Sequence, residues 1–119
     1  MKQKLSLDFI AGLICGEGCF TSFIQNEKQK MFAFSLKMHF CDEELVIAVR
    51  DSSGLKENVH EYFHKERHYV VLNVRKREVI ENVIIPTFNN RLAGLKRKQF
   101  EWWRDDFYKN KINWKRDTN

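Results

Sequence analysis

The sequence predicts an α+β fold in which helices cover one face of an antiparallel sheet. Helical and strand patterns alternate along the chain, and 119 residues suffice for one domain spanning 1–119. A domain of this size buries roughly two-thirds of the surface of its unfolded chain, so it needs no disulfide or structural metal. The hydrophobic content of 43%, with five Gly and one Pro, excludes disordered, collagen-like and low-complexity chains.

A first helix is expected over residues 5–17. Ser6 can accept a hydrogen bond from a backbone N–H of the first turn, and Asp8 interacts favourably with the positive end of the helix dipole. Gly18 then ends the helix.

Two hairpins are expected, because strand patterns occur in pairs. Residues 19–25 and 32–40 flank a turn at 26–30, and residues 57–64 and 68–75 form the second pair. Alternation predicts one apolar and one polar face, and the polar face must meet water or a partner. In the first hairpin, Phe20, Ile24, Phe34, Leu36 and Met38 would face the helices, and Thr21, Phe23, Gln25, Ser35, Lys37 and His39 would face outward.

Three more helices complete the predicted order of helix, hairpin, helix, hairpin, helix, helix. Asp42 is a candidate N-cap for a short helix, and a further helix over 78–85 should stop near the proline. Residues 96–109 carry aromatic side chains at helical spacing. Trp103 is expected in the core, whereas Trp102 is open between the core and stacking on a base.

The positive charge is concentrated near the C-terminus. Residues 1–90 carry 12 Lys+Arg and 12 Asp+Glu, whereas residues 91–119 carry 9 and 4, so the net charge of +5 lies there. A basic, aromatic-rich segment favours a polyanion partner, most often nucleic acid, although a solvated helix face has the same composition. Lys98 in this segment is a candidate DNA contact.

An intracellular protein that is not secreted and has no membrane contact is expected. No stretch approaches the roughly 18 apolar residues of a membrane span. Asp8 and Glu17 interrupt the apolar run near the N-terminus, so it does not read as a signal peptide. Three cysteines in no framework spacing are typical of reduced thiols.

Residues 9–20, FIAGLICGEGCF, carry the most informative pattern. Ala11, Gly12, Cys15 and Gly16 place small side chains on one helix face, which allows a second helix to approach closely. Glu17 lies at the negative end of the helix dipole, where a divalent cation would compensate both charges.

The segment AGLICGEG at residues 11–18 resembles the motif of the LAGLIDADG homing endonucleases. The similarity continues through FSLKM at 34–38, VIIPTF at 83–88 and LKRKQF at 95–100. The resemblance implies an αββαββα fold and a homodimer whose motif helices pack at the two-fold axis. The implied partner is double-stranded DNA with a long, near-palindromic site.

The resemblance also implies an activity and its residues. Glu17 matches the family's metal-binding acid, Gly16 matches a residue whose main-chain carbonyl also ligates metal, and Lys96 matches a basic residue of the catalytic pocket. The implied activity is site-specific hydrolysis of double-stranded DNA with Mg²⁺ or another divalent cation. Ala11, Gly12, Cys15 and Gly16 would form the dimer interface.

Two positions depart from the family pattern. Cys15 occupies the place of the motif's first acid, and Phe40 occupies a strand-end position that is often Gln or Lys. These departures leave open a non-catalytic DNA-binding regulator or an RNA-splicing maturase on the same fold.

Overall fold

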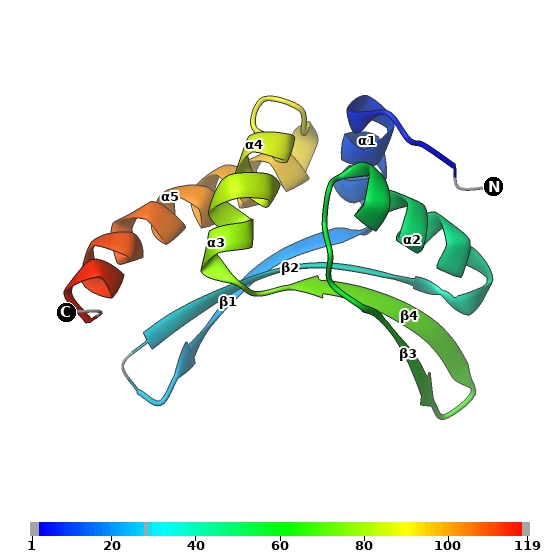
Figure 1. Cartoon of the computed structure of the whole chain (residues 1–119), viewed down its shortest axis with the longest axis horizontal. Coiled ribbons are helices and arrows are strands. Elements are labelled where there is room, and N and C mark those ends of the chain that lie inside the picture. The colour runs from blue at the N-terminus through cyan, green and yellow to red at the C-terminus, as the bar shows by residue number, and fades with distance from the viewer. Residues whose placement is uncertain (1–2, 28, 118–119) are drawn as a thin grey trace.

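Four antiparallel strands form a curved sheet with helices on one face (Figure 1). The computed structural model describes residues 3–27 and 29–117. The strands pair in the order β1-β2-β4-β3, which confirms the predicted α+β architecture. The strands are β1 (Gly18–Gln25), β2 (Gln29–His39), β3 (Val59–His64) and β4 (Arg67–Val74), and the helices are α1 (Leu7–Glu17), α2 (Glu43–Ser52), α3 (Arg77–Val79), α4 (Ile85–Phe88) and α5 (Gly94–Asp117).

Both ends of α1 are specified by side-chain size and polarity. The Ser6 hydroxyl accepts a hydrogen bond from the Phe9 N–H at 3.1 Å, which confirms the predicted N-cap. The backbone of Gly18 is extended, a conformation that any residue can adopt, so the backbone angles do not require glycine here. A Cβ at this position would lie 2.4 Å from Cγ2 of Ile14, so the close approach of β1 to α1 requires glycine.

The start of α2 differs from the prediction. Asp42 precedes the helix, but its side chain makes no capping hydrogen bond. A short 3₁₀ helix, Phe40–Asp42, intervenes, and Nδ1 of His39 accepts the Cys41 N–H at 3.0 Å. His39 therefore caps the 3₁₀ turn, whereas Asp42 occupies the predicted N-cap position of α2 without a side-chain hydrogen bond. Phe40 lies in the 3₁₀ turn rather than at the strand end.

The helical segment from α3 to α4 passes through Pro86 instead of stopping before it. A π-helical turn, Ile80–Ile84, joins the two helices, and the Ile85 N–H donates to the Ile80 carbonyl five residues back. Pro86 thus falls in the first turn of α4, directly after the π-helical turn, where the altered hydrogen-bonding pattern accommodates a residue without an N–H.

The core lies between the sheet and the helices, and α5 supplies much of it. Trp103 is buried, as predicted, and its Nε1 donates to the Thr21 carbonyl at 2.8 Å. Phe20 of β1 contacts rings of Phe34, Phe88, Phe100 and Trp103 at centroid distances of 5.1 to 5.8 Å. α5 continues past the predicted end at residue 109. Within the described ranges, no helix is both long enough and apolar enough to cross a membrane.

Candidate functional site

The sheet face that no helix covers carries the predicted contact residues. Residues opposite each other in antiparallel strands share a face. Cys19 lies opposite Ser35, and Ser35 lies opposite Asn73. Counting every second residue from these positions places the six outward candidates together on this outer face: Thr21, Phe23, Gln25, Ser35, Lys37 and His39.

The second hairpin extends the outer face with residues that the sequence reasoning did not propose as contacts. Tyr69 lies opposite His39, and Tyr62 of β3 lies opposite Tyr69. Arg67 and Asn73 belong to the same face, because each lies an even number of residues from Tyr69. The buried alternation of Val70, Leu72 and Val74 is the sequence signal that could have identified them.

Cations lie over aromatic rings on this outer face. Nζ of Lys37 lies 4.2 Å from the centroid of the Tyr69 ring, and that ring stacks on Tyr62 at 5.5 Å. The Arg75 guanidinium lies 5.5 Å from the Phe23 ring. Each ring attracts its cation through the quadrupole of its π system, so the two charges are held on the uncovered face.

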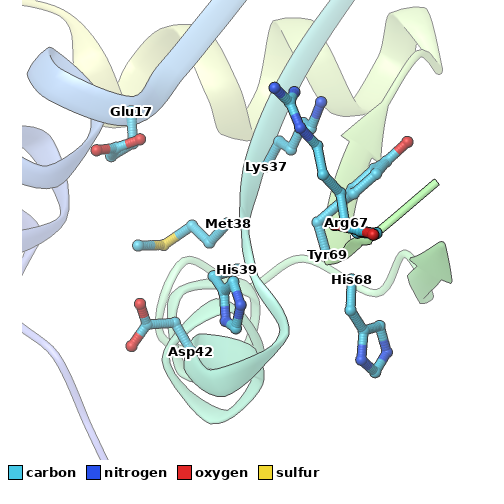
Figure 2. Close-up of a pocket in the computed structure, with 9 residues that line it drawn as sticks. Glu17, Lys37, Met38, His39, Asp42, Arg67, His68 and Tyr69 are labelled. Atoms are coloured by element: carbon cyan, nitrogen blue, oxygen red, sulfur yellow. The ribbon is translucent and has the colours of Figure 1, made fainter. Parts of the chain in front are cut away.

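A hollow of about 680 Å³ connects the end of α1 to this face. In Figure 2, Glu17 lies on one side of β2, and Lys37, Arg67 and Tyr69 gather on the other. The lining of the hollow therefore combines carboxylates with cationic side chains. It is lined by Glu17, Lys37, Met38, His39, Asp42, Glu66, Arg67, His68 and Tyr69.

Lys96 contacts the residue that follows Glu17, at the junction of α1 and β1. Glu17 is exposed, and within residues 3–27 and 29–117 its carboxylate makes no hydrogen bond or ion pair. Nζ of Lys96 donates to the carbonyl of Gly18 at 2.6 Å, which ties α5 to the residue after Glu17. The structure thus places the two predicted catalytic residues at the same junction.

The described residues of one chain supply few ligands for a metal ion near Glu17. No group of three or more His, Cys, Asp or Glu that could hold a metal occurs among the described residues. The Glu17 carboxylate and the exposed Gly16 main chain present oxygen ligands, which Mg²⁺ prefers. These residues fit a hard divalent cation if a second copy supplies further ligands.

The stripe of small residues on α1 is only partly available to a second copy. Ala11 is 2% exposed, so it belongs to the core of its own chain, and Cys15 accepts the Ala93 N–H at 3.4 Å. Gly12 and Gly16 are exposed, and no side chain or neighbouring element lies within 4 Å of the place that a Cβ would occupy. Phe9, 51% exposed, lies one turn before Gly12. The surface of α1 that remains free for a second copy therefore excludes Ala11, which the prediction included, and Cys15 is already in contact with Ala93.

Lys98, Trp102 and Phe40 lie apart from the outer face. Lys98 is exposed on α5, on the helix side of the sheet, and Trp102 of the same helix is also exposed rather than in the core. The Phe40 ring stacks on His68, with centroids 3.9 Å apart. The predicted DNA contact at Lys98 is thus separate from the six on the strands.

Comparisons with known proteins agree with this fold. The family model described as LAGLIDADG endonuclease matches residues 10–106. The LAGLIDADG homing endonuclease I-GzeII, solved in complex with its DNA target, is similar at 28% identity and a TM-score of 0.79 over 89% of this chain. The homing endonuclease I-TnaI is similar at 24% identity and a TM-score of 0.77, over 89% of this chain and 74% of that one.

The match to I-GzeII covers 36% of that protein, so this chain spans about a third of its length. A third similar structure, the I-LtrWI homing endonuclease bound to target DNA, has 24% identity and a TM-score of 0.73 over 83% of this chain and 35% of that one. A search of curated proteins found no match.

Proposed function

The chain belongs to the LAGLIDADG endonuclease family, and we propose that it is a site-specific endonuclease that hydrolyses double-stranded DNA. The observation that carries this proposal is the Glu17 carboxylate at the end of α1, which has no hydrogen-bond or ion-pair partner among the described residues. Lys96 donates a hydrogen bond to the carbonyl of Gly18, the next residue. Glu17 and this hydrogen bond both lie at the junction of α1 and β1, and β1 belongs to the sheet whose uncovered face carries the cations. This arrangement suits cleavage of a phosphodiester that the sheet holds in place.

We propose that DNA lies along the outer face of the sheet. A two-stranded ribbon fits the major groove, where polar side chains read base edges. Gln25, Ser35 and Lys37 have the donors and acceptors for this task, and Phe23 is suited to a thymine methyl group. Thr21 and His39 complete the contacts on the first hairpin, and the residues of the second hairpin extend them.

We propose that two copies assemble through α1. Gly12 and Gly16 leave open space on the helix surface, and Phe9 beside them exposes half of an aromatic side chain. Such a face allows two helices to pack closely, and a two-fold axis there would match a near-palindromic DNA site. The interface then uses Phe9, Gly12 and Gly16, while Cys15 lies at its edge.

The assembly test places one bulky side chain on this face. Gly12→Leu should convert the dimer into monomer or aggregate, as measured by sedimentation. Glu44→Leu, which adds the same side chain at an exposed position of α2, is the control and should leave the dimer unchanged. A Gly12→Leu protein that sediments like the wild type would contradict the proposed interface.

We propose that Glu17 from each copy, with the Gly16 main-chain carbonyl, would hold Mg²⁺ or another divalent cation. Such a cation supplies Lewis-acid activation of water and neutralises charge on the phosphate. The chain's own residues orient the substrate: outer-face cations contact phosphates, and Lys96 stabilises the negative charge that develops during hydrolysis. Because Lys96 also donates to the Gly18 carbonyl, its ammonium is kept next to the Glu17 junction.

The decisive experiment compares cleavage and binding on one target duplex, selected from a randomised library with the wild-type protein. Glu17→Gln should abolish Mg²⁺-dependent cleavage and leave binding intact or tighter, because it removes a negative charge near phosphates. Lys96→Ala should slow cleavage and weaken binding. Glu44→Gln, at an exposed position on α2, is the control that should cut normally. Cleavage retained by Glu17→Gln would overturn this mechanism.

A second candidate function is binding without cleavage, as a DNA-binding regulator or an RNA-splicing maturase. The specific observation in its favour is Phe40, whose apolar ring stacks on His68 where the family often has a polar residue. This alternative would be favoured if the wild-type protein bound its nucleic-acid target tightly and specifically but cleaved it with none of the divalent cations tested.

We also propose that the chain works as one domain inside the cell. The three cysteines Cys15, Cys19 and Cys41 are free thiols, which suits a reducing compartment.

A further inference from the structure

An indole on α5 is left unused by the fold. Trp102 is 82% exposed, whereas the neighbouring Trp103 is 6% exposed and packs in the core. Large aromatic side chains are usually buried or occupied by a partner, because their apolar surface is costly to leave in water. The exposure of Trp102 therefore indicates that its indole contacts another molecule.

Two unpaired cations flank the indole. Lys98 precedes Trp102 by four residues and Lys109 follows it by seven, so all three project from the same side of the helix. Both lysines are exposed, and over the described part of the chain neither forms an ion pair or hydrogen bond. Their separation is about 16 Å along the helix axis at 1.5 Å per residue.

The nearby carboxylates do not cancel these charges, because each already has a cationic partner. Glu101 pairs with Arg97 and Asp105 with Arg104 on α5 itself, and Asp106 pairs with Lys30 of β2. The side of α5 around Trp102 therefore presents a net positive charge.

A hollow of about 600 Å³ adjoins the indole, between α5 and β1. Its walls include Phe20 and Ser22, which point to the helix side of the sheet, opposite to Thr21 and Phe23. The hollow is thus separate from the outer face to which duplex DNA is assigned above. It is lined by Phe20, Ser22, Lys30, Gln99, Trp102, Trp103, Asp105, Asp106 and Lys109.

The chemistry of this surface favours a nucleic acid over a protein. Of the other exposed apolar residues of α5, Leu95 and Ile112 are separated from Trp102 along the helix by Lys98 and Lys109. Tyr108, 41% exposed, lies six residues from Trp102 and therefore projects about 120° away around the helix. A protein-docking face needs contiguous apolar surface, and these ammonium groups interrupt it. An indole between free cations is instead the combination that binds single strands, whose unpaired bases stack while their phosphates meet lysines.

We propose that Lys98, Trp102 and Lys109 form a second nucleic-acid site, which binds a single-stranded segment. An unpaired base stacks on the Trp102 indole, and the two ammonium groups contact the phosphates on either side. Duplex DNA does not satisfy this site, because its bases are already stacked and present no free ring face. This site goes beyond the proposed cleavage of duplex DNA and uses none of its residues on the strands.

The test measures binding of labelled oligothymidylate and oligouridylate to the full-length protein by fluorescence anisotropy. Trp102→Ala should weaken binding about five-fold or more, and Trp102→Phe should retain part of it, because stacking requires a ring. The double variant Lys98→Ala and Lys109→Ala should reduce the magnitude of the slope of log affinity against log salt concentration by about 1.4. Each of the two lost phosphate contacts accounts for roughly 0.7 of this change. Leu95→Ala, an exposed apolar change on the same helix, is the matched control.

Duplex competition separates this site from the proposed function. Single-stranded binding should survive an excess of target duplex and the Lys37→Ala substitution, and unfolding midpoints should show that Trp102→Ala is folded. Equal affinity for both oligonucleotides indicates stacking and phosphate contacts alone, whereas preference for oligouridylate indicates an added 2′-hydroxyl contact. The proposal would be overturned if Trp102→Ala bound the oligonucleotides as tightly as the wild type, or if the target duplex displaced them. It would also be overturned if Trp102→Ala changed the sedimentation of the protein and left oligonucleotide binding unchanged.

Discussion

Gly18→Ala tests whether the junction of α1 and β1 is as tightly packed as the structure indicates. The added Cβ would lie 2.4 Å from Cγ2 of Ile14 and 3.0 Å from its carbonyl oxygen. Ile14 is fully buried, and its carbonyl accepts the Gly18 N–H. Neither partner can therefore move away without disturbing the core or the end of the helix.

The expected cost follows from this overlap. Forcing an extra carbon into a packed core typically destabilises a protein by about 1–3 kcal/mol. In a chain of this length each kcal/mol lowers Tm by roughly 3–5 °C. Urea unfolding followed by circular dichroism at one fixed protomer concentration gives the free energy of unfolding directly.

Gly12→Ala is the matched control for this prediction. It is the same substitution within α1, six residues earlier in the chain, but no side chain or neighbouring element lies within 4 Å of the new Cβ. Alanine is favoured over glycine in a helix interior by about 1 kcal/mol, so this variant should be as stable as the wild type or more stable. A Gly18→Ala protein with an unchanged or higher unfolding midpoint would refute the packing argument.

Three further predictions concern single contacts. Tyr69→Leu should weaken DNA binding about two- to five-fold, because it removes the ring that lies against the Lys37 ammonium, whereas Tyr69→Phe should leave the affinity unchanged. If both variants lost the same affinity in an anisotropy titration, a role for the ring would be contradicted. Trp103→Phe should lower the free energy of unfolding by about 1 kcal/mol, because the hydrogen bond to the Thr21 carbonyl is lost; an unchanged urea midpoint would argue against that bond. Phe107→Ala should cost about 3–5 kcal/mol in the same assay, because it empties a fully buried position; a cost under 1 kcal/mol would mean that α5 is not part of the core.

Most of the fold could be predicted from local patterns. The alternation in β2 identified its buried face, and the aromatic spacing in α5 identified Trp103 as a core residue. Hydrogen bonding around α2 was less predictable, because His39 and Asp42 are both able to cap and the backbone geometry decides between them. The π-helical turn before Pro86 was not predictable, since proline usually ends a helix and only packing reveals the wider turn.

The candidate site was predictable in part. Glu17 and Lys96 came from a resemblance in the sequence, and the contact of Lys96 with Gly18, the residue after Glu17, depends on α5 packing against α1 and β1. In the folded chain Ala11 is buried in the core and Phe9 is exposed, a difference that periodicity did not distinguish.

By itself the sequence determined the order of the elements, the polar face of the first hairpin and the basic end of the chain, because each depends on residues close together along the chain. The tertiary structure alone decided that Tyr69 lies beneath Lys37, that only Gly12 and Gly16 of the small-residue stripe remain fully open, and that Trp102 lies in solvent between two unpaired lysines. These features depend on strand register and helix packing between segments distant in sequence, and local periodicity carries no information about such distances.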